Sequence, residues 1–278
     1  MTKKSTLAKL DNGTIQVTFT LSWKDVSTVQ NQVLEEEGQK VTIPGFRKGK
    51  APLSKVKEKV SSQVVIEHTL NHFYSFIISE IINTHKVKPA IYPRLEILKA
   101  IDEEDWEIRA TTCELPQFEL GDYRKLVLDN VKQEKVQTPK PQKEQAILKT
   151  LVENIKITIP ALLVDEEVNQ RLSELLARIE KLGLQLESYL TQIGKNPQTL
   201  REEYIAQAKS TISIELILGK IANTQGIKAE ESEVDSAIKA ASAGQVEVEK
   251  KLNTPKQRNI IKNVLQRRTV LDSLVALI

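Results

Sequence analysis

The sequence predicts an α+β domain over residues 1–115 and an all-α domain over residues 146–278, with an extended linker over residues 116–145 between them. Near the N-terminus apolar residues alternate strictly with polar ones, which is the pattern of a half-buried strand. From Ile147 onward they recur at three- and four-residue steps, as on one face of a helix. A chain of 278 residues also forms two domains more often than one.

The first domain is predicted to contain three strands and two helices. Residues 14–23 alternate as TIQVTFTLSW, and helical spacing follows with Gly38 near its end. Pro52 suits the first turn of the second helix, where its missing N–H would have no partner. The expected elements are a strand at 14–23, a helix at 24–38, a helix from 52 to about 84, and strands at 94–98 and 106–113.

Prolines punctuate the polar stretch that follows and predict the extended linker. Beyond it, an apolar stripe ends at Gly183. The stretch from Thr199 to Glu202 has the spacing of a capping box, and Thr254 with Pro255 opens a last helix. No alternating pattern of any length interrupts these helices, so the second domain is predicted to be all-α.

Composition excludes several classes of protein. Cys113 is the only cysteine, which excludes an intrachain disulfide and favours a reducing cytosol. No apolar run approaches the roughly 20 residues that cross a bilayer, and the N-terminus lacks the apolar core of a signal peptide. We therefore expect a cytoplasmic protein without membrane contact. Neither nucleotide-binding glycine motif is present, so no cofactor is expected.

Two candidate reactive sites have simpler interpretations. His68 and His72 are four residues apart on a predicted helix, but Thr69 stands where a zinc protease needs glutamate, and no third ligand is apparent. Ordinary surface histidines are the better interpretation. Cys113 lies in a strand-like run with nothing nearby in sequence to lower its pKa, so a packed thiol is expected. No catalytic residue and no metal site are predicted.

Residues 43–52, IPGFRKGKAP, form what we call the basic loop. They lie within residues 40–59, which hold seven Lys or Arg against one Glu, although the whole chain carries only +3. Gly45 and Gly49 permit tight turns, and Phe46 gains nothing from exposure to water. An aromatic ring flanked by cations suits a partner that offers phosphates or carboxylates beside an apolar niche. A solvated helix–helix loop is the simpler alternative.

The run from Gly45 to Pro52 resembles the signature loop of the trigger factor family of bacterial ribosome-associated chaperones, at all eight positions. Residues 1–115 resemble that family's ribosome-binding domain, and the region from Ile159 onward resembles its helical, substrate-cradling domain. The resemblance implies docking on the large ribosomal subunit, on protein and rRNA near the tunnel exit. The residues implied in ribosome binding are Gly45, Phe46, Arg47, Lys48, Gly49, Lys50 and Pro52.

The resemblance also implies that the helical domain holds nascent or unfolded polypeptides through many weak apolar contacts, with passive release because no ATP motif is present. Most apolar stripes in that domain must nevertheless be core. Members of the family often dimerise, so a homodimer off the ribosome is left open. The residues taken as client-facing are Val168, Leu172, Leu176, Ile179 and Leu190.

One departure from the family is plain in the sequence. Members usually carry an FKBP-type prolyl isomerase domain of about 100 residues between the two regions. Here only a short polar stretch separates Leu115 from Ile147, without alternating strands or aromatic pocket residues. We therefore expect the isomerase domain, and with it enzymatic activity, to be missing.

Three alternatives to a ribosome-docked chaperone remain. The first is a prolyl isomerase, the activity usual in the family, which the missing domain disfavours. The second is an RNA-binding protein that uses the basic loop without any chaperone role. The third is a periplasmic chaperone with a related helical domain, which is disfavoured because a signal peptide is lacking.

Overall fold

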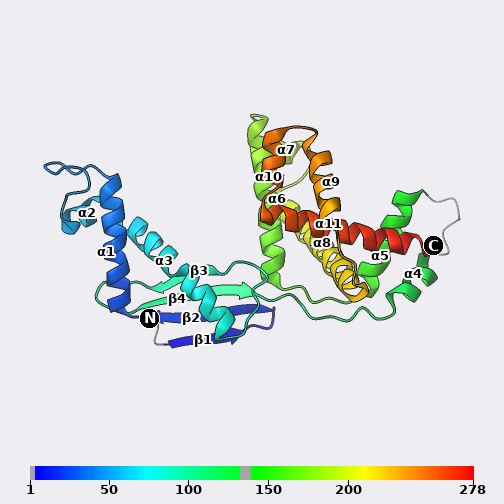
Figure 1. The fold of residues 1–278 in the computed structure, drawn as a ribbon, viewed down its shortest axis with the longest axis horizontal. Helices are drawn as coiled ribbons and strands as arrows, with labels where there is room; N and C mark the ends of the chain where they lie inside the picture. The colour runs from blue at the N-terminus through cyan, green and yellow to red at the C-terminus, as the bar shows by residue number, and fades with distance from the viewer. Residues whose placement is uncertain (1–3, 132–138) are drawn as a thin grey trace. The chain divides into compact units, whose positions relative to one another are not determined.

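The structure, a computed structural model, describes residues 4–131 and 139–278. The chain divides into two compact units (Figure 1). The first unit comprises Met1–Leu115 and Pro160–Leu163, and the second comprises Pro116–Ile159 and Val164–Ile278. Sheet and helices make up the first unit and, among the described residues, only helices make up the second, which confirms the predicted fold class.

The first unit contains a four-stranded antiparallel sheet with the strand order β1-β2-β4-β3. The central strands β2 and β4 pair Val17 with Ala110 and Phe19 with Ile108. These four residues are fully buried, as strict alternation requires when one face of a sheet is covered. The strands are β1 (Lys4–Lys9), β2 (Thr14–Leu21), β3 (Arg94–Lys99) and β4 (Trp106–Cys113).

Sequence reasoning found β2, β3 and β4 but missed β1. The segment KSTLAK lies at the edge of the sheet, where Leu7 is the single large apolar residue that packs against the core. One inward apolar side chain does not make an alternating pattern, so the strand leaves little trace in the sequence.

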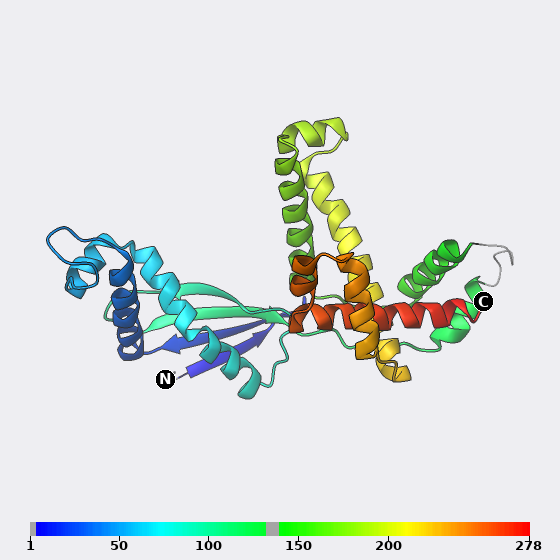
Figure 2. The ribbon, with the colours of Figure 1, turned by 45° about the horizontal axis from the view of Figure 1, so that its top comes forward.

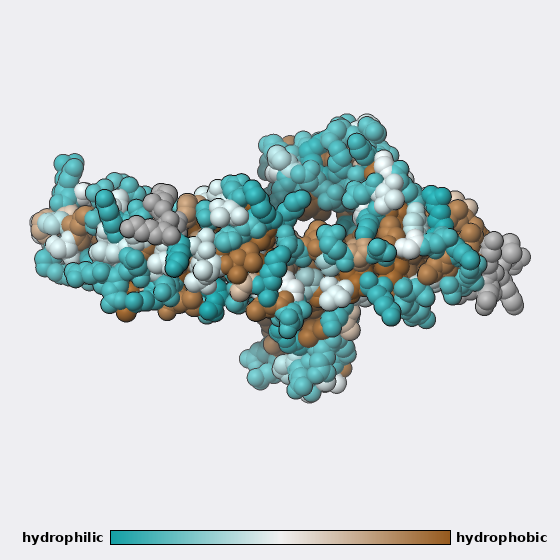
Figure 3. Space-filling view, turned by 90° about the horizontal axis from the view of Figure 1, so that it is seen from below, coloured by the Kyte–Doolittle hydropathy of each residue, from teal (hydrophilic) through white to brown (hydrophobic). Residues whose placement is uncertain are grey.

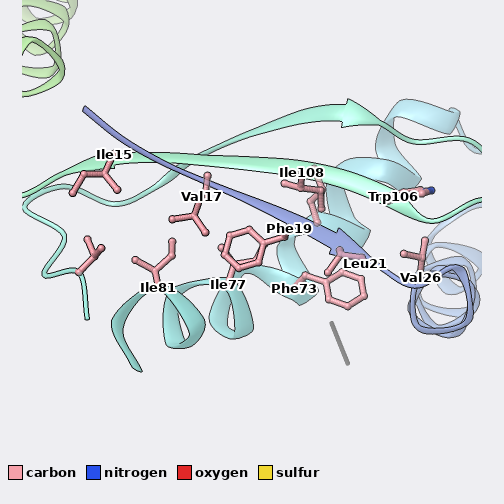
Figure 4. Packing of buried hydrophobic residues seen from close by; sticks show 13 residues of the cluster. Ile15, Val17, Phe19, Leu21, Val26, Phe73, Ile77, Ile81, Trp106 and Ile108 are labelled. Atoms are coloured by element: carbon pink, nitrogen blue, oxygen red, sulfur yellow. The ribbon is translucent and has the colours of Figure 1, made fainter. Parts of the chain in front are cut away.

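Helix α3 (Ser62–Asn83) covers the apolar face of the sheet. Figure 4 shows Phe73, Ile77 and Ile81 pointing from this helix toward Phe19 and Ile108 on the strands. Helix α1 (Trp23–Lys40) adds Val26 to the same core. Ser22 caps α1 by accepting a hydrogen bond from the Asp25 N–H at 3.3 Å.

The predicted single helix from 52 to about 84 is wrong, because the chain breaks at Val60 and Ser61. Both residues have extended backbone angles, and they separate α2 (Leu53–Lys59) from α3. Helix α2 packs against the far half of α1, whereas α3, apart from Val65 near its start, packs against the sheet. Their apolar spacing continues across the break, so periodicity alone does not show it.

The second unit is built around four helices that share one core. Helix α8 passes α11 and α5, and α4 packs on α5; Figure 2 shows α8 in yellow and α11 in red. The buried residues of this core are Val127, Val131, Ile147, Leu151, Ile155, Ile217, Leu218, Ile221, Ala222, Val270, Leu271 and Leu274. These helices are α4 (Tyr123–Val131), α5 (Lys140–Asn154), α8 (Pro197–Gln225) and α11 (Pro255–Val275).

The remaining helices of this unit are α6 (Ala161–Lys181), α7 (Leu186–Gln192), α9 (Glu231–Ser242) and α10 (Val246–Leu252). Thr254 caps α11 as predicted. The capping box of α8, however, uses Asn196 and Thr199, so this helix begins three residues before the predicted start. None of the helices formed by residues 4–131 and 139–278 combines the length and apolar character needed to cross a bilayer.

The prediction that residues 116–145 form an extended linker is wrong for much of its length, because α4 and the first turns of α5 lie within it. Val127 and Val131 are buried at four-residue spacing. Pro139 and Pro141 begin α5, as proline can in a first turn, instead of extending the chain. Residues 132–138 of the predicted linker lie outside the described residues.

The core under the sheet predicts a large effect of truncating Ile77. The side chain is fully buried, so Ile77→Ala should lower the free energy of unfolding of the first unit by about 2–5 kcal/mol. Both tryptophans, Trp23 and Trp106, lie in this unit, so their fluorescence in a urea titration reports its unfolding. Ile82→Ala, at an exposed position of the same helix, is the matched control and should change stability little.

Candidate functional site

The basic loop joins α1 to α2 through two successive turns. The Phe46 N–H donates a hydrogen bond to the Ile43 carbonyl oxygen at 3.2 Å, and the Lys50 N–H donates one to the Arg47 carbonyl oxygen at 2.9 Å. Each bond closes a four-residue turn, so the loop has a defined shape.

Both glycines of the loop have backbone angles that glycine favours. Gly45 has φ +83° and Gly49 has φ +74°, in the left-handed region where a Cβ atom causes strain. No atom lies within 4 Å of where a Cβ atom at Gly45 would stand. The position therefore favours glycine because of its backbone angle and not because a side chain would clash.

A small apolar cluster holds the two ends of the loop, and we call it the loop-base core. Ile43 is buried where the loop begins, while Ala51 and Leu53 are partly buried where it returns to α2. The buried members are Val33, Leu34, Ile43, Val56 and Val65, and the partly buried ones are Val29, Val41, Ala51, Leu53 and Val60.

The tip of the loop presents an aromatic ring and three cations to solvent. Phe46 keeps 42% of its surface exposed, although a large apolar side chain gains free energy by burial. Arg47, Lys48 and Lys50 are also exposed, and within residues 4–131 and 139–278 none of the three forms an ion pair.

The lysines on the flanking helices are different, because each of three has an acidic partner. Lys40 Nζ lies 2.6 Å from Glu37 Oε1, Lys55 Nζ lies 2.8 Å from Glu58, and Lys57 Nζ lies 2.7 Å from Asp102 on the β3–β4 turn. Of the seven cations in residues 40–59, four form no ion pair with a described residue: the three at the tip and Lys59 at the end of α2.

A close helix contact lies directly below the loop. A Cβ atom at Gly38 would stand 3.1 Å from a methyl group of Val56, so α1 and α2 approach more closely than a larger residue allows. Sequence reasoning noticed Gly38 only as a helix end. A glycine inside an apolar-periodic helix signals such a close approach, but not which helix makes it.

A second feature that the sequence did not reveal is a nearly buried carboxylate at the end of α1. Glu37 is 8% exposed, and the lysine beside it, Lys40, lowers the pKa of this carboxyl by hydrogen bonding and by its charge. His68 Nδ1 lies 3.1 Å from Glu37 Oε1, the oxygen that also contacts Lys40. His72 Nε2 lies 3.9 Å from Glu36 Oε1. Both histidines are part-exposed and face carboxylates of α1.

The structure describes the surroundings of the two other candidate sites, a metal centre and the Cys113 thiol. In the part of the chain that the structure describes, no cluster of three His, Cys, Asp or Glu residues is arranged to hold a metal ion. Cys113 is fully buried at the end of β4, and this burial raises the pKa of its thiol, which makes it a poor nucleophile.

The predicted client-facing residues of the second unit are mostly wrong. Val168, Ile179 and Leu190 are buried, so their side chains are not available on the surface of the folded protein. Leu172 is half-buried, and Leu176 is exposed. An apolar stripe at helical spacing marks the face that packs inside, so it points away from any docking surface.

Comparison with known families covers almost the whole chain. The model of the bacterial trigger factor protein matches residues 3–148, and the model of the bacterial trigger factor C-terminus matches residues 119–276. Each match spans more than half of the chain. This chain belongs to the trigger factor family.

Curated trigger factors match over part of their length. The trigger factor of Caldanaerobacter subterraneus subsp. tengcongensis is 32% identical over 179 residues, 63% of this chain and 40% of that protein. The trigger factor of Staphylococcus carnosus is 28% identical over 64% of this chain and 40% of that protein. The first such relatives are matched over between 29 and 44% of their own length.

A solved trigger factor structure has the same fold. It comes from work on promiscuous substrate recognition in folding and assembly by the trigger factor chaperone. It superposes with a TM-score of 0.66 over 99% of both chains at 12% identity.

The close contact at Gly38 can be tested with Gly38→Val. The added methyl groups would overpack the contact with Val56, so we expect about 1–3 kcal/mol of destabilisation and loss of amide-exchange protection in α2. Gly219→Val, in α8 where a Cβ meets nothing within 4 Å, is the matched control and should be neutral or slightly stabilising. Unchanged exchange rates in α2 of Gly38→Val would show that the contact does not hold the loop.

The pKa of Glu37 predicts how stability depends on pH. Because the folded-state pKa lies below the ordinary value of 4.5, the ionised carboxylate stabilises the fold above that value, and this contribution is lost as the pH falls through the folded pKa. Glu37→Gln should therefore flatten the loss of first-unit stability between about pH 5 and pH 3. Urea titrations by tryptophan fluorescence measure this, with Glu36→Gln as the exposed control; parallel curves for wild type and Glu37→Gln would contradict it.

Proposed function

We propose that this trigger factor is an ATP-independent chaperone that docks on the large ribosomal subunit near the peptide tunnel exit and shields nascent polypeptides with its helical unit. The observation that carries the docking step is the tip of the basic loop. It presents an exposed Phe46 and three unpaired cations on turns that are already formed in the free protein.

The chemistry of the loop suits a mixed surface of charges and an apolar niche. Removing the exposed part of Phe46 from water supplies on the order of 1 kcal/mol. Arg47, Lys48 and Lys50 face rRNA phosphates or acidic side chains of a ribosomal protein, and each exposed ion pair adds less than about 1 kcal/mol. Because so few charges take part, binding should weaken only moderately as salt rises.

The preformed shape of the loop allows these small contributions to the binding free energy to suffice. The loop-base core and the two turns fix the loop before binding, so little conformational entropy is lost when it docks. An unstructured loop of the same composition would lose that entropy on binding and would bind more weakly.

The second unit is proposed to hold clients because apolar side chains remain on its surface. Figure 3 shows brown apolar patches between teal polar ones on this unit. Scattered patches of this kind give many weak contacts and no single fixed geometry, which suits clients of varied sequence. Exposed large apolar residues include Leu176, Leu182, Leu184, Ile193, Val246, Ile260 and Val264.

We propose further that this chain works without an isomerase domain. The two family matches overlap over residues 119–148, so they leave no unmatched stretch between them that could hold an inserted domain. Proline-peptide isomerisation above the uncatalysed rate would contradict this part of the proposal.

Docking is tested by co-sedimentation with bacterial ribosomes. Phe46→Ala/Arg47→Ala/Lys48→Ala removes the ring and two of the cations, and we expect it to lower the fraction pelleted with large subunits at least tenfold. The matched control is Lys88→Ala/Tyr92→Ala/Arg94→Ala, which removes the same types of exposed side chain elsewhere on the first unit and should pellet like wild type.

Circular dichroism and tryptophan fluorescence establish that both triple variants are folded. Equal pelleting of both would show that the basic loop is not the anchor. Tight binding of the wild type to naked RNA, without preference for ribosomes, would favour an RNA-binding protein instead.

A further inference from the structure

The tip of the basic loop is placed to meet a broad, flat surface. Figures 1 and 2 show the segment between α1 and α2 projecting beyond both helices at one end of the first unit. Phe46 lies on this segment with 42% of its surface exposed. Its neighbours Arg47 and Lys48 are exposed as well. A planar partner that approaches this end of the first unit therefore meets a ring and two cations together.

We propose that the tip of the basic loop also binds the surface of an anionic phospholipid bilayer, with Phe46 at the boundary between headgroups and acyl chains and the cations on the lipid phosphates. The inference goes beyond the proposed docking on ribosomes and does not depend on it. No described helix is long and apolar enough to cross a bilayer, and the proposed contact is a peripheral one. We expected no membrane contact from the sequence because no segment could span a bilayer, but a peripheral contact needs no such segment.

The charge of the loop is complementary to an anionic membrane surface. No Asp or Glu lies between Glu37 and Glu58. None of the cations listed below has to leave an internal partner among the described residues in order to bind a headgroup, and each raises the affinity for an anionic bilayer on the order of fivefold. The cations of residues 40–59 that form no ion pair with a described residue are Arg47, Lys48, Lys50 and Lys59.

Phe46 has the chemistry of an interfacial anchor. Its ring carries no polar atom, and two residues with long side chains follow it directly. Arg47 and Lys48 can lay their aliphatic stems beside the inserted ring and keep their charged ends at the level of the headgroups. A bilayer offers both contacts at once, because its apolar phase begins directly beneath the lipid phosphates.

The backbone at the tip is suited to leaving water. An N–H group without a partner is costly in an apolar phase. The Phe46 N–H already donates a hydrogen bond to the Ile43 carbonyl oxygen at 3.2 Å, and the Lys50 N–H donates one to the Arg47 carbonyl oxygen at 2.9 Å. Pro44, two residues before the ring, has no N–H group. Insertion of the ring therefore leaves neither of the two bonded donors without a partner.

Single-stranded RNA is the other polyanion that the loop could meet, and the composition of the loop favours lipid over RNA. Proteins that bind single strands usually offer several aromatic side chains on which successive bases stack. Phe46 is the only aromatic residue within residues 40–59. One ring is enough for an anchor in a bilayer, where apolar contact does not require a row of stacking surfaces.

Co-sedimentation of the full chain with sucrose-loaded vesicles tests the proposal. The wild type should bind vesicles of about 30% phosphatidylglycerol in phosphatidylcholine at least tenfold more tightly than vesicles of phosphatidylcholine alone. Phe46→Ala/Arg47→Ala/Lys48→Ala should weaken binding to the anionic vesicles on the order of twentyfold or more. The matched control is Lys88→Ala/Tyr92→Ala/Arg94→Ala, which removes the same types of exposed side chain elsewhere on the first unit and should bind like the wild type.

Phe46→Trp separates insertion of the ring from attraction of charge, because it keeps a large aromatic side chain at the tip. Its additional emission should shift to shorter wavelength on the anionic vesicles and should be quenched by lipids with brominated acyl chains. Trp106 is buried and Trp23 is half-buried in the core under the sheet, so the difference from the wild type reports position 46. Emission that neither shifts nor is quenched would overturn the proposed insertion.

The remaining outcomes separate this inference from its rivals. Equal binding of the wild type to anionic and neutral vesicles, or equal binding of the wild type and the Phe46 triple variant to anionic vesicles, would overturn it. If Phe46→Ala binds the vesicles like the wild type and single-stranded RNA displaces both proteins, the loop is a general polyanion surface and the inference is wrong. Vesicle binding without pelleting on ribosomes would contradict the proposed docking and leave this inference standing, and the reverse result would contradict this inference alone.

Discussion

Helix α1 belongs to two cores at once, and the geometry of the basic loop depends on this. Its first half buries Val26 against the sheet, and its second half buries Val33 and Leu34 in the loop-base core. The helix thus connects a large, stable core to a small one that could not hold its shape alone. The exposed ring of Phe46 is unfavourable in water, so the loop can present it only because the apolar residues on both sides of the loop are anchored.

Charge pairing differs between the helices that support the basic loop and the tip of the loop itself. On the loop's supporting helices, Lys40 and Lys55 pair with acids three residues away on the same helix, and Lys57 pairs with Asp102 on the β3–β4 turn, which is distant in sequence. At the tip, Arg47, Lys48 and Lys50 form no ion pair with any residue that the structure describes. Charges that are satisfied within the protein contribute little to binding, whereas unpaired exposed ones can steer an anionic partner toward the loop.

Sequence reasoning succeeded where a local rule determines the structure. Alternation predicted β2 and β4, Thr254 with Pro255 predicted the start of α11, and the eight-residue motif predicted the loop and its family. It failed where tertiary packing determines where a helix ends and which helix it contacts. The break at Val60 and the contact of Gly38 with Val56 depend on which core each helix reaches, and local spacing does not encode that.

The same limit explains why client-facing residues cannot be found from apolar stripes. A stripe with helical period identifies the buried face, as Val168 and Ile179 show, and a docking surface consists of apolar residues left over from that pattern. Val264 has that character, since it lies half exposed on a helix whose inner face carries Leu271 and Leu274. The unpaired cations at the tip of the loop suit an anionic partner of defined geometry, whereas exposed apolar side chains such as Val264 suit contacts that depend little on the partner's sequence.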